Sequence, residues 1–187
     1  GNDFVMIDDR SLQYKSGENL TTEQIARICD RHFGVGGDGL ILLENDDQAD
    51  FKMVYFNSDG NESTMCGNGG RCIVAFAKHL NVFEGNSCSF KAIDGLHEAT
   101  IDGNLVDLKM INVANIEKIG DDYFLDTGSP HYVSFCESVK DLDLITEAKK
   151  IRYNDRFSAE GTNVNFVTAT NEKLLVRTYE RGVENET

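Results

Sequence analysis

Basic residues are scarce in this sequence. Its 187 residues include 18 lysines and arginines against 32 aspartates and glutamates, which gives a formal net charge of -14. Nucleic acids and anionic membrane surfaces bind proteins through basic surfaces, so this charge argues against both kinds of partner. A small anionic or zwitterionic substrate remains compatible with it, because the local field at a site can oppose the net charge.

Proline and long apolar runs are also scarce. The single proline rules out a proline-rich linker. No apolar run approaches the roughly 20 residues of a membrane-spanning helix. With 40% hydrophobic and 27% charged residues, the composition is typical of a soluble globular protein. A chain of this length can form one large domain or two small ones without disulfides.

Cysteine spacing gives no sign of a disulfide framework or a zinc site. The five cysteines are an odd number without a CxxC pair, namely Cys29, Cys66, Cys72, Cys88 and Cys136. This pattern favours a reducing compartment, so we expect a cytoplasmic protein. The glycine-rich stretch 31–39 follows a predicted helix and enters a strand, whereas a dinucleotide fingerprint follows a strand and opens a helix. We therefore expect neither a metal nor a cofactor.

Residues 19–34 carry the strongest helix signals. Thr21 and Gln24 have the spacing of a capping box, and Gly34 is placed to end the helix. The apolar face of this helix is predicted to comprise Ile25, Ile28, Cys29 and Phe33. A second helix is expected from about Asn68 to His79, and a third near residues 141–151.

Short strands account for most of the remaining sequence. They are expected at residues 4–8, 40–44, 51–57, 87–93, 96–101, 105–110, 123–126, 131–136, 163–170 and 173–180. Tight turns at 94–95 and 102–104 favour antiparallel hairpins. The pattern predicts an α+β fold, with a domain junction within residues 112–121.

Cys66 lies where a glycine-rich stretch opens the second predicted helix. The first backbone N–H groups of a helix lack intrahelical partners and its dipole favours negative charge, so the amides of Gly67, Asn68 and Gly69 can hold a carboxylate or phosphate. The same field lowers the pKa of a cysteine, so Cys66 is expected to be largely thiolate near neutral pH. Cys72 lies within the helix and is expected to fill the core.

The residues alone leave several roles open for Cys66. A zinc ligand is disfavoured, because neither His79 nor His97 has the required spacing. A thiol hydrolase would pair Cys66 with a base such as His131, and most free cysteines are inert. Predicted strand ends carry four further polar residues, Asn163, Asn165, Glu180 and Arg181. Their amide, carboxylate and guanidinium groups suit the charged ends of an amino acid.

Six segments together resemble one family, the diaminopimelate epimerases. They are GNDFVMID at 1–8, RHFGVGGDG at 31–39, FNSDGNESTMCGNGGRC at 56–72, GSPH at 128–131, GTNVNF at 161–166 and YERGVENET at 179–187. The resemblance implies an α+β protein of two pseudo-symmetric domains, each a mostly antiparallel sheet wrapped around a central helix. The N-terminal domain would span residues 1–112 and an incomplete C-terminal domain residues 113–187, with the active site in the cleft between the halves.

The resemblance also implies the reaction, an interconversion of LL- and meso-diaminopimelate on the route to lysine and peptidoglycan precursors. Such an enzyme is a homodimer and needs no pyridoxal phosphate. A cysteine thiolate on one face of the α-carbon removes the proton, a thiol on the other face returns one, and helix N-termini stabilise the carbanion. Cys66 would be one member of this pair of cysteines.

Further site residues are carried over from the matching motifs. The implied substrate-contact residues are Asn2, Asn57, Gly67, Asn68, Asn163, Glu180 and Arg181. Three of them would hold the distal amino-acid end of the substrate, namely Asn57, Asn163 and Arg181. The implied catalytic residues are Cys66, His131 and Glu180, with the last two orienting the substrate amine or assisting proton transfer.

The sequence departs from the family pattern in three places. Ser129 stands where many members have asparagine, and Gly39 where some have glutamine, so a contact at position 39 would use the backbone. The second catalytic cysteine would come a few residues after Thr187. Both ends interrupt expected elements, so we interpret the sequence as a piece of a longer protein.

Two rival functions are compatible with these residues. One is another cofactor-independent isomerase of the same architecture, similar to proline racemase. The other is a non-catalytic amino-acid-binding module that keeps the anion-holding loops. A Cys-Gly-Thr-Gly-like stretch after Thr187 would favour the epimerase over the binding module.

We predict that the 187-residue chain alone does not epimerise diaminopimelate, because it carries one half of the acid–base pair. Incorporation of solvent deuterium at the α-carbon measures the reaction. Turnover as fast as that of a longer version of the protein would contradict the prediction.

Overall fold

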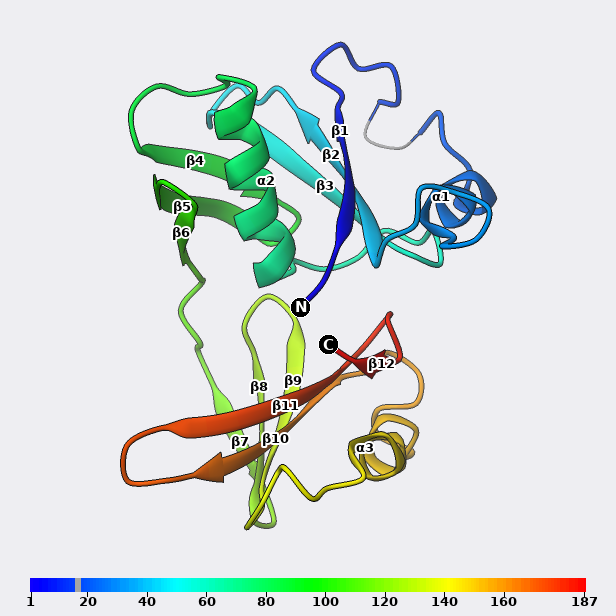
Figure 1. Ribbon diagram of the computed structural model, residues 1–187, viewed down its shortest axis with the longest axis vertical. Helices are drawn as coiled ribbons and strands as arrows, with labels where there is room; N and C mark the ends of the chain where they lie inside the picture. The colour runs from blue at the N-terminus through cyan, green and yellow to red at the C-terminus, as the bar shows by residue number, and fades with distance from the viewer. Residues whose placement is uncertain (16–17) are drawn as a thin grey trace. The chain divides into compact units, whose positions relative to one another are not determined.

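The computed structural model describes residues 1–15 and 18–187. The chain forms two compact units, unit 1 at Gly1–Ile111 and unit 2 at Asn112–Thr187 (Figure 1). Each unit contains a six-stranded mixed sheet, and most strand pairs are antiparallel, which confirms the α+β prediction. These units are defined by contacts within the chain, so the expected boundary between two domains at residues 112 and 113 stays a prediction.

Unit 1 is built on a sheet with the strand order β1-β2-β3-β4-β5-β6. Its strands are β1 (Phe4–Asp8), β2 (Gly39–Glu44), β3 (Phe51–Asn57), β4 (Ser87–Ala92), β5 (Gly95–Asp102) and β6 (Leu105–Lys109). The β1–β2 and β3–β4 pairs are parallel, and the chain between their strands carries helices α1 (Thr22–Cys29) and α2 (Gly67–His79). Every residue of β2 is buried because both faces of this strand pack against a hydrophobic cluster.

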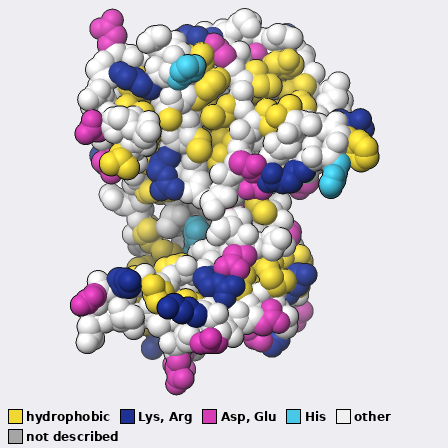
Figure 2. Space-filling view, in the orientation of Figure 1, with side chains coloured by type: hydrophobic (Ala, Val, Ile, Leu, Met, Phe, Trp, Pro, Cys, Tyr) yellow, Lys and Arg dark blue, Asp and Glu magenta, His cyan; other side chains and the backbone are white. Residues whose placement is uncertain are grey.

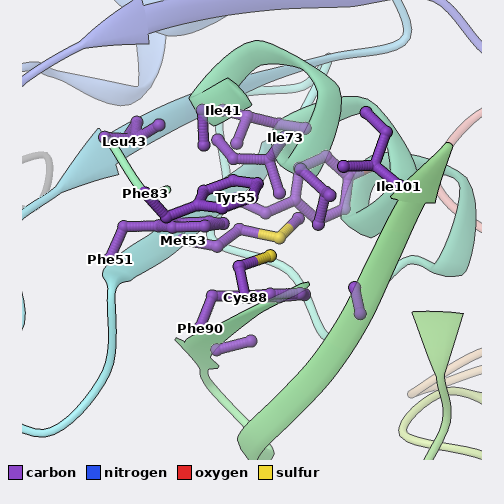
Figure 3. Close-up of a cluster of buried hydrophobic side chains, with 14 of the residues drawn as sticks. Ile41, Leu43, Phe51, Met53, Tyr55, Ile73, Phe83, Cys88, Phe90 and Ile101 are labelled. Atoms are coloured by element: carbon purple, nitrogen blue, oxygen red, sulfur yellow. The ribbon is translucent and has the colours of Figure 1, made fainter. Parts of the chain in front are cut away.

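Helix α2 is the central helix of unit 1 and lies across its sheet (Figure 1). Ile73, Val74 and Ala77 are buried, and they pack with side chains of the sheet such as Met53 and Phe90 in the main core (Figure 3). Glycines at the start of α2 permit this approach. A Cβ at position 70 would lie 2.6 Å from Met65 Cε, and one at position 69 would lie 3.2 Å from Ile41 Cδ1.

Helix α1 begins as predicted but ends earlier. The capping box is present, since Gln24 N donates to Thr21 Oγ1 at 3.2 Å and Thr21 N donates to Gln24 Oε1 at 2.8 Å. The helix ends at Cys29 rather than at Gly34, because Asp30 is extended and its carboxylate accepts the N–H groups of residues 32 and 33. Phe33 is therefore 72% exposed, and its predicted place on the buried face is wrong.

Unit 2 contains a sheet with the order β12-β11-β10-β9-β8-β7 and one helix. The elements are β7 (Ile116–Ile119), β8 (Asp122–Asp126), β9 (Pro130–Phe135), α3 (Leu144–Arg152), β10 (Asn163–Ala169), β11 (Leu174–Glu180) and β12 (Asn185–Glu186). The sequence patterns did not indicate β7 or β12. β7 is a short, mostly exposed strand within the expected junction, and β12 has only two residues.

The two units share one arrangement of strands. In unit 1, β1 runs parallel to β2 and β3 returns antiparallel, which places Phe4, Gly39 and Asn57 in one row. In unit 2, β9 runs parallel to β10 and β11 returns antiparallel. Since His131 pairs with Asn163 and Val164 pairs with Tyr179, the matching row is His131, Asn163 and Glu180. By this correspondence α3 is the counterpart of α1, not of the central helix α2.

Charged side chains of both signs are interspersed on the face of the two units that Figure 2 shows. None of the helices in the described part of the chain has the length and apolar character needed to cross a membrane.

Alanine substitutions at two glycines should separate the destabilisation caused by backbone strain from that caused by a collision of the added Cβ with a neighbouring atom. Gly60 and Gly85 both have positive φ angles, of 88° and 69°. A Cβ at Gly60 would lie 2.1 Å from Thr22 O, whereas one at Gly85 would meet nothing within 4 Å. Gly85→Ala should cost about 1–2 kcal/mol through left-handed strain, and Gly60→Ala roughly 1–3 kcal/mol more through the collision. Urea unfolding measures both, and equal losses would contradict the role given to the Thr22 contact.

Candidate active site

Cys66 is the N-cap residue of α2. Its backbone is extended, with φ -113° and ψ 117°, and its Sγ accepts a hydrogen bond from Gly69 N at 3.4 Å. Its carbonyl accepts Gly70 N at 2.8 Å. The half-buried thiol packs against the edge of the main core. The sulfur thus lies at the positive end of a helix, which is an environment that stabilises a thiolate.

The start of α2 is tied to the start of β1. Asn68 Nδ2 donates to Asn2 Oδ1 at 2.7 Å, and Asn2 Nδ2 donates to Asp38 Oδ2 at 3.1 Å. Arg71, one turn into the helix, also donates to Asn68 Oδ1. Two predicted substrate-contact residues, far apart in the sequence, are therefore hydrogen-bonded beside Cys66.

Arg31 supports this part of unit 1 from the loop after α1. Its guanidinium donates to both carboxylate oxygens of Asp3 at 2.9 and 2.7 Å and to Asp38 Oδ1 at 2.8 Å. The hydrogen bonds from Arg31 hold the pKa of Asp3 below its ordinary value. The sequence patterns marked this loop for its glycines and missed Arg31, because a charged residue on a loop is usually solvated.

Gly39 and Asn57 face each other at the ends of β2 and β3. A Cβ at position 39 would lie 2.5 Å from Phe56 O and 2.6 Å from the ring of Tyr55. This close approach of Tyr55 explains why the chain has glycine here. Asn57 is half-buried, and its backbone N–H donates to Asn61 O at 3.0 Å, which closes the turn leading toward α2.

Asn163 organises the second group of polar residues, in unit 2. Its Nδ2 donates to Ser129 Oγ at 3.0 Å and to Pro130 O at 3.1 Å, and its Oδ1 accepts Arg181 N at 2.9 Å. The residue is only 6% exposed. Because both amide hydrogens are engaged, Asn163 acts here as a brace between two turns. Ser129, the departure from the family pattern, is one of its partners.

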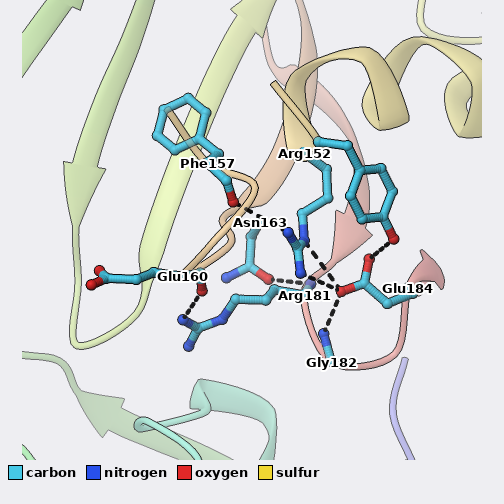
Figure 4. Close-up of polar contacts among 8 residues, drawn as sticks. Arg152, Phe157, Glu160, Asn163, Arg181, Gly182 and Glu184 are labelled. Carbon is cyan, nitrogen blue, oxygen red and sulfur yellow. Dashed lines mark hydrogen bonds and ion pairs between the residues drawn. The ribbon is translucent and has the colours of Figure 1, made fainter. Parts of the chain in front are cut away.

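Glu184 fixes the turn that carries Glu180 and Arg181 (Figure 4). Arg152 Nη2 donates to Glu184 Oε1 at 2.9 Å, Tyr153 Oη donates to Oε2 at 3.0 Å, and Gly182 N donates to Oε1 at 3.3 Å. Burial raises the pKa of Glu184, but these hydrogen bonds and the charge of Arg152 outweigh it, so the pKa lies below its ordinary value.

Gly161 lets the arginine side chains of this region pass close to the backbone. A Cβ at this position would lie 2.7 Å from Arg181 Cδ and 2.9 Å from Arg152 Cζ. Arg181 Nη1 donates to Glu160 O at 3.1 Å. Arg152 and Glu184 were missed by sequence reasoning because they lie far apart in the sequence, and only the fold pairs a helix end with a turn.

His131 lies on β9 and directly follows Pro130, whose carbonyl accepts a hydrogen bond from Asn163. Its Nδ1 is 3.1 Å from Asn165 Nδ2 on β10. Burial lowers the pKa of His131, the side-chain contact with Asn165 and the charge of Asp126 oppose this shift, and Arg181 adds to it. The imidazole is therefore neutral near pH 7. Glu180, the last residue of β11, is half-buried and belongs to the same row of strand residues as His131 and Asn163.

The other cysteines and histidines do not join either group. Cys72 is half-buried on α2 rather than part of the core cluster, so its expected role as a core residue is wrong. His97 is buried, and its Nε2 lies 2.9 Å from Asp94 Oδ1. Among the described residues, no three His, Cys, Asp or Glu side chains are grouped to hold a metal ion.

Comparisons with known proteins show the family of this chain. A family model described as diaminopimelate epimerase matches residues 1–113. A diaminopimelate epimerase of Flavobacterium psychrophilum is 56% identical over 190 residues, which cover 100% of this chain and 72% of that protein. The chain belongs to the diaminopimelate epimerase family. A diaminopimelate epimerase of Chlorobaculum tepidum is 43% identical over 195 residues, and the match covers 100% of this chain and 74% of that protein.

Solved structures outside the family share the fold. A PhzF-family phenazine biosynthesis protein of Bacillus anthracis superposes with a TM-score of 0.65 at 14% identity, covering 100% of this chain and 69% of that chain. A probable proline racemase of Agrobacterium radiobacter gives a TM-score of 0.63 at 12% identity, covering 84% of this chain and 58% of that chain. At these identities the likeness shows the architecture alone.

Removing the charge of Glu184 should destabilise unit 2 more than removing that of Glu186. Glu184→Gln leaves Arg152, whose side chain is 13% exposed, without its anion, and should cost about 1–3 kcal/mol near neutral pH. Glu186→Gln breaks a pair with the more exposed Arg177 (29%), and should cost less than about 1 kcal/mol.

The pH dependence of this effect follows from the lowered pKa of Glu184. A depressed folded-state pKa gives stability that is complete above the unfolded-state value, about 4.3. That stability is lost as the pH falls through the folded-state value. Urea unfolding at several pH values should therefore show the deficit of Glu184→Gln shrinking in acid. A deficit independent of pH would contradict the assignment.

Proposed function

We propose that this chain acts in the interconversion of LL- and meso-diaminopimelate, with Cys66 as one of two cysteines that exchange the α-proton. The observation that carries the proposal is the position of Cys66 as the N-cap of α2 in a chain that belongs to the diaminopimelate epimerase family. Removing an α-proton of an amino acid requires a base on one face, and a thiolate serves when a helix N-terminus stabilises it.

The amides that follow Cys66 suit the developing carbanion. When the proton leaves, negative charge spreads onto the α-carboxylate, and fixed N–H donors stabilise it without reorganisation. Gly69 N is already directed to the Cys66 sulfur. Gly67 and Asn68, the first two residues of α2, carry N–H groups that the helix itself does not use. We infer that these two amides bind the α-carboxylate, with Asn2 holding the Asn68 side chain in place.

The polar residues of unit 2 suit the rest of the substrate. Arg181 offers a guanidinium for the distal carboxylate, and Glu180 offers a carboxylate for an ammonium group. Asn163 braces the turn on which both stand, and it is proposed as a further contact to the substrate. Asn57, at the matching strand end of unit 1, is proposed as a further contact to the distal end.

The proposal extends to the setting of the enzyme. A diaminopimelate epimerase supplies precursors for lysine and peptidoglycan, which places it in the cytoplasm, where the five cysteines stay reduced. We also propose a homodimer, on the family resemblance. The chemistry assigned to Cys66 and the α2 amides uses no cofactor.

Replacing Cys66 in the full-length protein should remove most of the epimerisation. Cys66→Ser should lower the rate by about 100-fold or more, because a serine hydroxyl is a far weaker base than a thiolate. The conversion of LL- to meso-diaminopimelate in deuterated water, with deuterium at the α-carbon of the product, measures the rate. Cys72→Ser is the matched control and should leave the rate nearly unchanged. Activity retained in Cys66→Ser would remove Cys66 from the proton-transfer step.

A further inference from the structure

Asn165 makes three side-chain contacts inside unit 2. It lies two residues after Asn163 on β10, and its side chain contacts both neighbouring strands, β9 and β11. Nδ2 donates to Tyr132 O at 3.0 Å and lies 3.1 Å from His131 Nδ1, both on β9. Oδ1 accepts the hydroxyl of Thr178 on β11 at 2.9 Å.

The orientation of the Asn165 amide follows from its partners. A backbone carbonyl oxygen only accepts hydrogen bonds, so the side of the amide that faces Tyr132 O is the NH₂ group. That nitrogen carries two hydrogens, and the second one points to His131 Nδ1. The Thr178 hydroxyl donates to the remaining oxygen. His131 Nδ1 is therefore the acceptor in this contact, and a neutral imidazole that accepts at Nδ1 carries its proton on Nε2.

We infer that Asn165 is a positioning residue that holds His131 as the neutral Nε2–H tautomer, so that His131 serves the reaction as a hydrogen-bond donor and not as a base. The inference rests on the proposed function for its place in catalysis, but the tautomer itself does not. With Nδ1 occupied by Asn165, the imidazole presents only an N–H to its surroundings. An N–H donor stabilises a thiolate or a carboxylate oxygen and cannot remove a proton from carbon.

The charges around His131 are compatible with this role. Asp126, on β8, favours the imidazolium, whereas Arg181, in the turn after β11, disfavours it, and burial is the largest influence and also disfavours it. Near pH 7, Asn165 is thus hydrogen-bonded to the neutral form of the His131 imidazole. This also separates the present site from a thiol hydrolase, in which the histidine would accept the proton of Cys66.

Nuclear magnetic resonance of the 187-residue chain tests the tautomer directly. The sequence contains four histidines, so His131→Gln identifies the resonances of His131. In the unsubstituted chain above the pKa of His131, we expect a pyridine-type ¹⁵N shift for Nδ1 and a pyrrole-type shift for Nε2. The reverse pattern, or averaged shifts, would overturn the inference.

Asn165→Asp is the decisive variant because it keeps the shape of the side chain. A carboxylate beside Nδ1 accepts a hydrogen bond, so the proton should move to Nδ1 and the pKa of His131 should rise by roughly one to three. Thr168→Val is the matched control. It removes two side-chain hydrogen bonds of β10, one donated to Cys136 O and one accepted from Val139 N, and should leave the His131 shifts unchanged. If Asn165→Asp does not fold, Asn165→Ala tests the same point, because it removes the amide donor at Nδ1, and the shifts of His131 should become averaged. His131 shifts that stay unchanged in the folded variant would overturn the inference.

Kinetics of the full-length protein connect the tautomer to the reaction. Asn165→Asp should lower kcat about tenfold, equivalent to roughly 1.4 kcal/mol, with KM changed less than about twofold. The same loss with an unaltered tautomer would make Asn165 a purely structural residue. An inactive unsubstituted protein would contradict the proposed function while leaving the tautomer result intact.

Discussion

The close packing of α2 on its sheet is the constraint on which the candidate site around Cys66 depends. Gly69 and Gly70 have no side chains, so the first turn of the helix lies directly against Ile41, Met53 and Met65. This contact fixes where the helix begins, and the N-cap position then fixes the sulfur of Cys66 and the direction of the next amides. A larger residue at position 70 would require Met65 and Leu108 to move, because a Cβ there would lie 2.6 and 2.8 Å from the ends of their side chains.

A common strand register explains why polar residues gather at one place in each unit. In both, three strand ends are aligned, and the middle strand contributes either Gly39 or Asn163. The two residues differ in how they occupy the space at this strand end. Gly39 makes room for Tyr55, whereas Asn163 fills the space and joins the neighbouring turns by hydrogen bonds. One backbone plan thus supports a close approach of Tyr55 to the backbone in unit 1 and a hydrogen-bonded brace in unit 2.

The sequence predicted most elements of this fold because their signals are local. The capping box of Thr21 and Gln24 and the apolar run of β2 are readable from neighbouring residues. The end of α1 was misplaced because an aspartate side chain at position 30, and not the glycine, caps the turn. The strand β7 was missed because it is short and mostly exposed, and it exists through its pairing with β8.

In the candidate site too, residues with local sequence signals could be predicted, whereas residues that depend on distant partners could not. Cys66 could be singled out because its glycine-rich context and the helix after it are contiguous. Arg31, Arg152 and Glu184 could not be assigned, because their partners come from distant segments that only the fold brings together. The orientation of His131 depends on Asn165, and a sequence gives no information on which ring nitrogen faces which strand.

The hydrogen bond from Gly69 N to the Cys66 sulfur has a consequence for redox chemistry. While the sulfur caps α2, it accepts a hydrogen bond from the backbone of the first helical turn. A helix N-terminus favours the thiolate, which is the form of cysteine that oxidants and alkylating agents attack, whereas burial raises the pKa of Cys29 and Cys88 and keeps those sulfurs protonated. The N-cap position that suits Cys66 to the proposed proton transfer therefore also makes it more open to oxidation than the buried thiols of the same chain.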